Sequence, residues 1–304
     1  MNKRFEHNIP SISFEEQELL AKKHVLVAGC GGRGGSIIEN LVRLGIGKIT
    51  AADNASFEIS DLNRQLLSTT DLIGTKKAFA ARDRAIAINP EITFNIWTMK
   101  ITEKNVDSAL AGKDLVIDAL DNVDDRLLLE DACAKAGITV IHGSVSGWRT
   151  QVMTVTPGSG SLADFYKNNT APAAASQLSF TSAFCAAVQA SEAVKVLCGT
   201  KSDLENKILI ADLKTNEFKI CDPDEKSTEE KSFTVTANIW GKAANDVTVS
   251  EYTTLQQLAD MLKVSVDSAM VNEKPVKYIN FGTTYLAEND KVTFIDYNSF
   301  ARGG

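Results

Sequence analysis

The chain has 304 residues, of which 44% are hydrophobic, so it is long enough to bury the core of one large domain and one small domain. Its formal net charge of -7 argues against nucleic acid or a membrane surface as a partner, because phosphate groups attract basic protein faces. No apolar run approaches the roughly 20 residues that span a bilayer, and no apolar signal segment follows the first residues. We therefore expect a cytoplasmic protein that acts on small molecules or other proteins.

Short apolar runs alternate with helical patterns from His24 onwards. The runs are typical of buried parallel strands, and they cover residues 24–29, 48–53, 92–97, 114–118 and 138–142. Apolar residues recur at helical spacing in residues 36–44, 76–88 and 124–136. Repeated units of strand and helix predict an α/β fold with a Rossmann-like, doubly wound sheet.

The rest of the first domain is predicted to contain further strands, in part antiparallel. They cover residues 151–156, 207–213 and 217–221, with a helix over 182–197. We place the end of this domain, residues 1–221, before a polar stretch at 222–231 that lacks periodicity and has the composition of a solvated linker.

A second, smaller domain is predicted over residues 232–304. Strands are expected over 233–239, 246–250 and 291–296, and a helix over 254–262, which Thr253 or Thr254 would cap. This ββαβ order is typical of a small ubiquitin-like β-grasp domain.

A glycine-rich loop follows the first predicted strand and opens the first predicted helix. Residues 29–34 fit the pattern GxGxxG through Gly29, Gly31, Gly32 and Gly34. Glycines let the backbone approach phosphate groups at a helix N-terminus, where amide groups favour anions. Asp53 ends the second strand, where a carboxylate can accept hydrogen bonds from ribose hydroxyls. By itself this pattern indicates only a nucleotide.

Two cationic residues flank the expected nucleotide pocket. Arg64 lies in the hexapeptide Ser-Asp-Leu-Asn-Arg-Gln at residues 60–65, and Lys77 ends Gly-Thr-Lys-Lys at residues 74–77. A triphosphate that is being cleaved needs added positive charge where negative charge develops. An arginine can bind two phosphate oxygens, and a lysine supplies a point charge. The pair therefore favours ATP chemistry over dinucleotide binding.

A third polar group, Asp-Ala-Leu-Asp-Asn at residues 118–122, ends the fourth predicted strand at the carboxyl edge of the sheet, where ligands bind in such folds. A carboxylate there can hold Mg2+ while phosphate oxygens complete the metal's ligand shell. The alternative is a cap for the helix that follows.

In this order and spacing, these motifs resemble the ThiF/MoeB/HesA family, the bacterial relatives of ubiquitin-activating enzymes, from about Arg4 to Cys221. The resemblance implies an adenylyltransferase that binds ATP and Mg2+ and adenylates the C-terminal glycine of a carrier protein. It assigns the roles of the motif residues as follows: Asp53 binds the ribose, Arg64 and Lys77 bind the phosphates, Asp121 binds Mg2+, and Asn63, Gln65 and Asn122 complete the cofactor site.

The resemblance also implies a homodimer in which an N-terminal arginine reaches into the partner's site. Here His7 stands at the position of that arginine. Arg4 or a protonated His7 would replace it, or the arm is purely structural.

The chain departs from the family pattern at other positions too. The zinc-binding cysteine pairs of the family are missing, since Asp-Phe-Tyr-Lys stands at 164–167, so we expect no structural zinc. The five cysteines are odd in number and form no CxxC pair, which predicts reduced thiols (Cys30, Cys133, Cys185, Cys198 and Cys221). No cysteine lies in residues 158–177, where a thioester nucleophile is expected, and Cys185 falls within a helical pattern that favours burial. Arg33 replaces an apolar residue of the glycine loop, either to contact phosphate or as a surface residue.

The C-terminal segment resembles the ThiS/MoaD sulfur carriers and ends in Gly303-Gly304. Two glycines can thread through a narrow channel, and an ionised terminal carboxylate needs no general base to attack ATP. We expect the chain to adenylate its own fused carrier, or a free one as well. A sulfur donor such as a cysteine desulfurase or sulfide would then form a thiocarboxylate.

Three alternatives remain open from the sequence. A nicotinamide-dependent oxidoreductase would use the same glycine loop, with His142 as its best-placed acid or base. A non-catalytic interaction protein would keep the nucleotide fold as a relic. A member of the same family could instead act on a small molecule or a tRNA base, with a regulatory C-terminal domain. The sequence does not decide between molybdenum or tungsten cofactor, thiamin or another metabolite as the acceptor of the sulfur.

Overall fold

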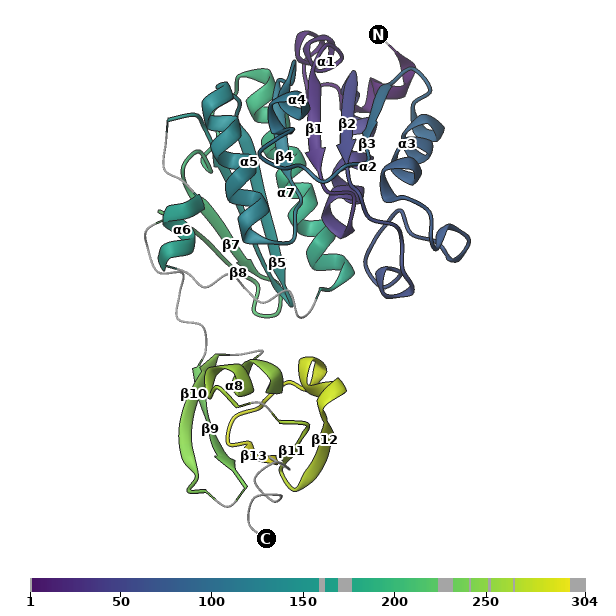
Figure 1. Ribbon diagram of the computed structural model, residues 1–304. Coiled ribbons are helices and arrows are strands. Elements are labelled where there is room, and N and C mark those ends of the chain that lie inside the picture. The colour runs from purple at the N-terminus through teal and green to yellow at the C-terminus, as the bar shows by residue number, and fades with distance from the viewer. Residues whose placement is uncertain are drawn as a thin grey trace. The chain divides into compact units, whose positions relative to one another are not determined.

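A computed structural model describes residues 2–158, 162–168, 177–223, 232–240, 242–250, 253–264 and 266–295. The chain divides into two compact units, residues 1–226 and 227–304 (Figure 1). The boundary falls within the stretch expected to be a linker. Residues 224–231 of that stretch, and the tail with Gly303 and Gly304, lie outside the described residues.

The first unit contains a mixed sheet of eight strands in the order β3-β2-β1-β4-β5-β6-β7-β8. The strands are β1 (His24–Ala28), β2 (Lys48–Ala52), β3 (Thr93–Trp97), β4 (Leu115–Asp118), β5 (Val140–Ser146), β6 (Arg149–Val155), β7 (Ile208–Asp212) and β8 (Glu217–Cys221). Strands β1 to β5 pair in parallel, and β5 to β8 pair antiparallel. This confirms the predicted Rossmann-like α/β fold of the first domain.

Helices cover both faces of this sheet (Figure 1). They are η1 (Lys3–Asn8), α1 (Phe14–Leu20), α2 (Gly32–Leu44), α3 (Lys77–Ile88), α4 (Val106–Leu110), α5 (Val123–Ala136), α6 (Leu162–Asn168) and α7 (Ser179–Cys198), with short 3-10 turns η2 (Ile59–Asp61) and η3 (Thr70–Leu72). Strand residues alternate between the two faces. Val25 and Val27 pack in a core with α2, α3 and α7, whereas Leu26 and Ala28 pack in a second core with α4, α5 and α6.

The sequence missed three short helices of this unit, α1, α4 and α6, which have seven, five and seven residues. Runs of this length give little helical periodicity to detect. The fifth strand was predicted to end at His142 but continues to Ser146, because its last residues pair with the antiparallel strand β6.

The second unit contains a five-stranded sheet in the order β10-β9-β13-β11-β12. Its elements are β9 (Ser232–Ile239), β10 (Asn245–Ser250), α8 (Leu255–Met261), β11 (Ser268–Val271), β12 (Lys274–Lys277), η4 (Tyr278–Thr283) and β13 (Lys291–Ile295). Strand β13 pairs in parallel with β9, and the other pairs are antiparallel. Leu255 and Leu258 of α8 join Val235 and Phe294 of the sheet in one buried core.

The predicted ββαβ order of this unit was incomplete, because β11 and β12 form an additional hairpin. Each strand has only four residues. The turn between them is Asn272-Glu273, with φ of 50° and 65°. Such turns are usually recognised by Asn-Gly, which this one lacks. Thr254 caps α8 through a reciprocal bond with Gln257, as one of the two predicted alternatives.

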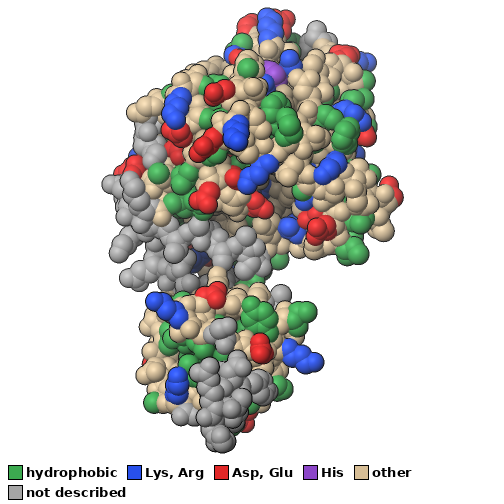
Figure 2. Space-filling model, viewed as in Figure 1, with side chains coloured by type: hydrophobic (Ala, Val, Ile, Leu, Met, Phe, Trp, Pro, Cys, Tyr) green, Lys and Arg blue, Asp and Glu red, His purple; other side chains and the backbone are tan. Residues whose placement is uncertain are grey.

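Side chains of both charge signs are interspersed on the face of the first unit that Figure 2 shows, in keeping with the net charge of -7. Among the helices that the structure describes, none has the length and hydrophobicity needed to cross a membrane.

Candidate active site

The glycine loop joins β1 to α2 and passes close to the end of β4. Gly29 has φ of 101°, and a side-chain carbon there would lie 2.7 Å from the Ala119 carbonyl oxygen. A side-chain carbon at Gly34 would collide with the Gly29 carbonyl. Gly31, the N-cap of α2, offers no side chain to the first turn of the helix. The loop therefore leaves amide groups of that turn available to an anionic ligand.

Asp53 lies just beyond the end of β2, beside the glycine loop. One carboxylate oxygen accepts a hydrogen bond from the Cys30 amide at 2.8 Å, and the other accepts one from the Ala55 amide at 2.7 Å. Each oxygen retains a further lone pair, so the carboxylate can still accept bonds from ribose hydroxyls. These backbone contacts fix the orientation of the Asp53 carboxylate, as its predicted binding of ribose requires.

Asp61 joins the two predicted phosphate-binding cations. Its carboxylate lies 3.1 Å from Lys77 Nζ and 3.5 Å from the Arg64 guanidinium. Burial alone would raise the pKa of Asp61, but bonds from the Glu58 amide and Lys77, with the charge of Arg64, outweigh this and lower it. Arg64 and Lys77, which are 13 positions apart in the sequence, are thus held together at one anion.

Arg64 is also held by Gln177, which precedes α7, and by Ser60 of η2. Its Nε donates to Gln177 Oε1 at 2.8 Å, and another of its nitrogens donates to Ser60 O at 2.8 Å. Asn63 accepts a bond from Arg64 at 2.9 Å and donates to the Gln177 carbonyl. In this structure Asn63 supports Arg64, and its predicted contact with the cofactor stays a prediction.

Buried polar atoms without partners lie against the glycine loop. The side chain of Gln65 lies close to Gly31, and Ser182 Oγ lies next to Gly32. Gln65 Oε1 and Ser182 Oγ are buried, and neither has a hydrogen-bond partner among the described residues. Unpaired buried polar atoms are costly, so they are suited to a polar ligand such as a nucleotide. The sequence predicted Gln65 but gave no signal for Ser182.

Asp121 and Asn122 have different roles in the turn between β4 and α5. Asn122 caps α5 by accepting a bond from the Asp125 amide at 2.8 Å, so the helix-cap alternative applies to this residue. Asp121 is exposed, and within the described part of the chain it accepts no hydrogen bond and forms no ion pair. A free carboxylate at the carboxyl edge of the sheet is a suitable oxygen ligand for Mg2+.

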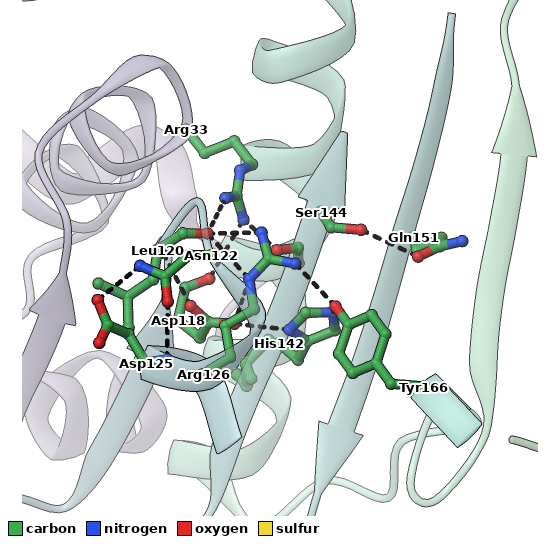
Figure 3. Close-up of polar contacts among 12 residues, drawn as sticks. Arg33, Asp118, Leu120, Asn122, Asp125, Arg126, His142, Ser144, Gln151 and Tyr166 are labelled. Atoms are coloured by element: carbon green, nitrogen blue, oxygen red, sulfur yellow. Dashed lines mark hydrogen bonds and ion pairs between the residues drawn. The ribbon is translucent and has the colours of Figure 1, made fainter. Parts of the chain in front are cut away.

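A buried charged cluster lies beneath this turn (Figure 3). Asp118 accepts a bond from His142 Nδ1 at 2.6 Å and lies 3.7 Å from Arg126 Nε. Burial opposes the ionisation of Asp118, but His142, Arg126 and Arg33 outweigh it and lower its pKa. Burial also lowers the pKa of His142, aided by the two arginines. The cluster therefore combines one carboxylate, two guanidinium groups and a neutral imidazole.

Arg33 belongs to this cluster, and the expectation of a surface residue is wrong, whereas a phosphate contact stays a prediction. Its side chain is buried and donates to the carbonyl oxygens of Leu120, at 2.6 Å, and Gly143. Its position in the loop alone could not show which way the side chain points. His142 is also fully buried, against Asp118 and Tyr166, which does not suit the hydride-transfer acid or base of the oxidoreductase alternative.

Cys185 is fully buried in α7, which confirms its predicted packing role. Burial raises the pKa of its thiol, so little thiolate forms near neutral pH. Among the described residues, none of the five cysteines forms a disulfide.

The N-terminal arm holds its arginine against its own chain. Arg4 donates to Asn89 at 3.1 Å and lies 3.9 Å from Glu91, whereas the His7 side chain is exposed. Within the described residues no three His, Cys, Asp or Glu side chains converge to bind a metal. The lack of a structural zinc stays a prediction.

A mixed Rossmann-like sheet with a glycine loop, a paired arginine and lysine, and a free carboxylate at its carboxyl edge defines a nucleotide-activating α/β enzyme. The profile of the ThiF family matches residues 5–232, so the chain belongs to the ThiF family. This membership confirms the predicted class of adenylyltransferase and favours it over the oxidoreductase alternative.

Curated relatives match a comparable share of the chain. A probable molybdopterin-synthase adenylyltransferase of Porphyra purpurea is 31% identical over 69% of this chain, and the match spans only 57% of that protein. The molybdopterin-synthase adenylyltransferase of Salmonella typhimurium is 31% identical over 68% of this chain and 85% of its own length. The SAMP-activating enzyme E1 of Haloferax volcanii is 29% identical, over 65% and 76%.

Solved structures share the fold. E. coli MccB with ATP superposes with a TM-score of 0.59 at 19% identity, over 70% of this chain and 67% of that one. E. coli tRNA N6-threonylcarbamoyladenosine dehydratase in complex with ATP has a TM-score of 0.56 at 22% identity, over 64% and 94%.

Proposed function

We propose that this protein uses ATP and Mg2+ to adenylate the C-terminal glycine carboxylate of a ubiquitin-like sulfur carrier. The observation that carries the proposal is the convergence of Arg64 and Lys77 on Asp61 beside the glycine loop. Two fixed cations suit a triphosphate that is cleaved. The relatives support the same chemistry. They include a sulfur carrier protein adenylyltransferase of Thermus thermophilus, which is 34% identical over 47% of this chain.

The reaction needs few groups beyond those at the site. A carboxylate oxygen of the carrier attacks the α-phosphorus of ATP, the bond to the bridging oxygen breaks, and pyrophosphate leaves with that electron pair. Arg64 and Lys77 would stabilise the charge on the phosphates, and Asp53 would orient the ribose. Mg2+, held by Asp121, would neutralise charge on the leaving group. The acyl-adenylate then awaits a sulfur nucleophile.

We further propose that the second unit, over residues 232–304, is the carrier. The order β10-β9-β13-β11-β12, with a parallel central pair and one helix packed on the sheet, supports a β-grasp fold. The sequence of its tail, Arg302-Gly303-Gly304, suits a narrow channel to the α-phosphate. The sulfur would come from a desulfurase persulfide or from sulfide, because Cys185 is buried.

A homodimer is part of the proposal. His7 is the better candidate for a residue that reaches a partner's site, since its side chain is 97% exposed and lies near Glu6, whereas Arg4 is 30% exposed and contacts Asn89 and Glu91.

Deletion of Gly303 and Gly304 tests the proposed substrate. The truncated chain should bind ATP as the parent does but release no pyrophosphate. The intact chain, incubated with ATP, Mg2+ and sulfide, should gain the mass of one sulfur in place of one oxygen. Unchanged pyrophosphate release by the truncated chain, with no other carrier present, would show that the tail is not the substrate and would favour a regulatory second unit.

A mixing experiment separates action within one chain from action between chains. The truncated chain keeps its site, and an Asp121→Ala chain keeps its tail. Restored pyrophosphate release on mixing would show that a tail enters a neighbour's site. If each chain acts only on itself, the mixture stays inactive.

A further inference from the structure

Two buried arginines bind the same backbone oxygen, the carbonyl of Leu120, immediately before Asp121. Arg33 donates to it at 2.6 Å, and Arg126 donates through two nitrogens at 3.0 and 2.6 Å. The exposed fractions of the two side chains are 7% and 6%. Figure 3 shows the guanidinium groups meeting at Leu120. The two guanidinium groups occupy both lone pairs of this carbonyl oxygen with charge-assisted bonds, which restrains the peptide more than a neutral turn contact does.

The turn itself provides few other contacts for Asp121. The Leu120 amide donates to Asp118 Oδ1 at 2.8 Å, and Asn122 is committed to capping α5. The Asp121 carboxylate has no hydrogen bond within the described residues. The charge of Arg126 attracts it without a hydrogen bond, so its position depends on that attraction and on the preceding peptide, which the two arginines fix.

Arg33 also connects this turn to the glycine loop. It is the second residue of α2, and besides Leu120 its guanidinium reaches the carbonyl oxygens of Gly143 in β5 and Asp118 in β4. Motion of the turn relative to the loop would break bonds of a buried cation, which is costly.

We propose that Arg33 is a positioning residue of the adenylation site, which acts with Arg126 through the Leu120 carbonyl to hold Asp121 where a divalent cation bound to ATP meets it. The inference rests on the proposed function, which assigns the metal to Asp121. This role explains why the glycine loop contains an arginine whose side chain is buried.

The test is the binding of Mn2+ to the intact chain in the presence of ATP, followed by electron paramagnetic resonance, together with pyrophosphate release as a function of Mg2+. Arg33→Met should weaken Mn2+ binding and raise the half-saturating Mg2+ concentration by about tenfold, as outer contacts of metal ligands do. ATP binding without a divalent cation should change less than twofold. Arg33→Lys, which keeps a cation, should lie between the parent and Arg33→Met.

Arg43→Met is the matched control, because Arg43 is an exposed arginine of the same helix that pairs with Glu39. It should leave both metal titrations unchanged. If Arg33→Met does not fold, Arg33→Lys carries the test. Parent-like Mn2+ binding in the folded Arg33 variants, whatever their melting temperatures, would overturn the inference. Parent-like binding in Asp121→Ala would instead overturn the metal assignment of the proposed function.

Discussion

The ammonium group of Lys77 lies 3.1 Å from a carboxylate oxygen of Asp61, and both side chains are largely buried. Asp61 thereby fixes the position of Lys77, which the sequence predicted to bind phosphate. Asp61 itself was not predicted as a site residue. Asp61 also contacts Arg64 and Gln65 of the same hexapeptide and so restrains three of the predicted site residues.

Asp61→Asn should reduce the turnover of adenylation by about tenfold, with a smaller change in the KM for ATP. The amide keeps the shape of the side chain but no longer attracts Lys77 and Arg64, so the cations lose their fixed positions. Steady-state pyrophosphate release measures both constants. Asp83→Asn, an exposed change in the helix of Lys77, is the control, and equal effects of the two variants would contradict a specific role for Asp61.

Arg64→Ala and Lys77→Ala should each reduce adenylation by on the order of 100-fold, as expected for groups that stabilise charge in the transition state. Arg64→Ala should melt close to the parent, whereas Lys77→Ala should also lower the melting temperature, because it leaves the buried carboxylate of Asp61 without its nearest cation. Rates and thermal unfolding of both variants are compared with those of Arg82→Ala, a control in α3 whose side chain is only partly exposed and pairs with Asp83. Losses of stability that parallel the losses of rate would indicate a structural role instead.

Cys185→Ser should leave adenylation nearly intact. The thiol is fully buried and its pKa is raised, so it supplies no thiolate to an acyl-adenylate. Pyrophosphate release and intact mass after reaction with ATP and sulfide provide the measurement. Abolished turnover in a variant that melts like the parent would revive a thioester mechanism.

His24 should make folding stability depend on pH. Its ring lies between the Gly112 carbonyl and the Thr50 hydroxyl, and burial, aided by the charges of Lys113 and Lys48, lowers its pKa to about 4. The folded state therefore favours the neutral ring. The stabilisation is complete above pH 6.5 and is lost as the pH falls from 6.5 towards 4, by about 2 kcal/mol in the free energy of unfolding.

Urea unfolding of the parent and of His24→Gln between pH 7 and pH 4.5 measures this effect. The difference in the free energy of unfolding between the two chains should shrink as the pH falls. His7→Gln changes an exposed side chain, so its free energy of unfolding should vary with pH as that of the parent does. A constant difference between parent and His24→Gln would show that the His24 ring does not titrate differently on unfolding.

The sequence by itself determined the order of the first unit and the identity of most candidate site residues. Short apolar runs located β1 to β5 because buried parallel strands need little else, and the spacing of the glycine loop required a tight passage from β1 to α2. Asp121 was selected because polar residues that end a parallel strand lie at the edge where ligands bind, and Arg64 and Lys77 because a triphosphate that is cleaved needs added positive charge.

Only the tertiary structure decided which of these residues meet and what holds them. Asp61, a near neighbour of Arg64, also reaches Lys77, and Arg33 turns inward to Leu120; these last two contacts join residues far apart in the chain. A sequence pattern reports periodicity along the chain, but the direction of a long side chain depends on the space that other elements leave for it. The burial of Arg33 depends on the arrangement of β4 and β5, because carbonyl oxygens of these strands accept the hydrogen bonds that make a buried guanidinium stable.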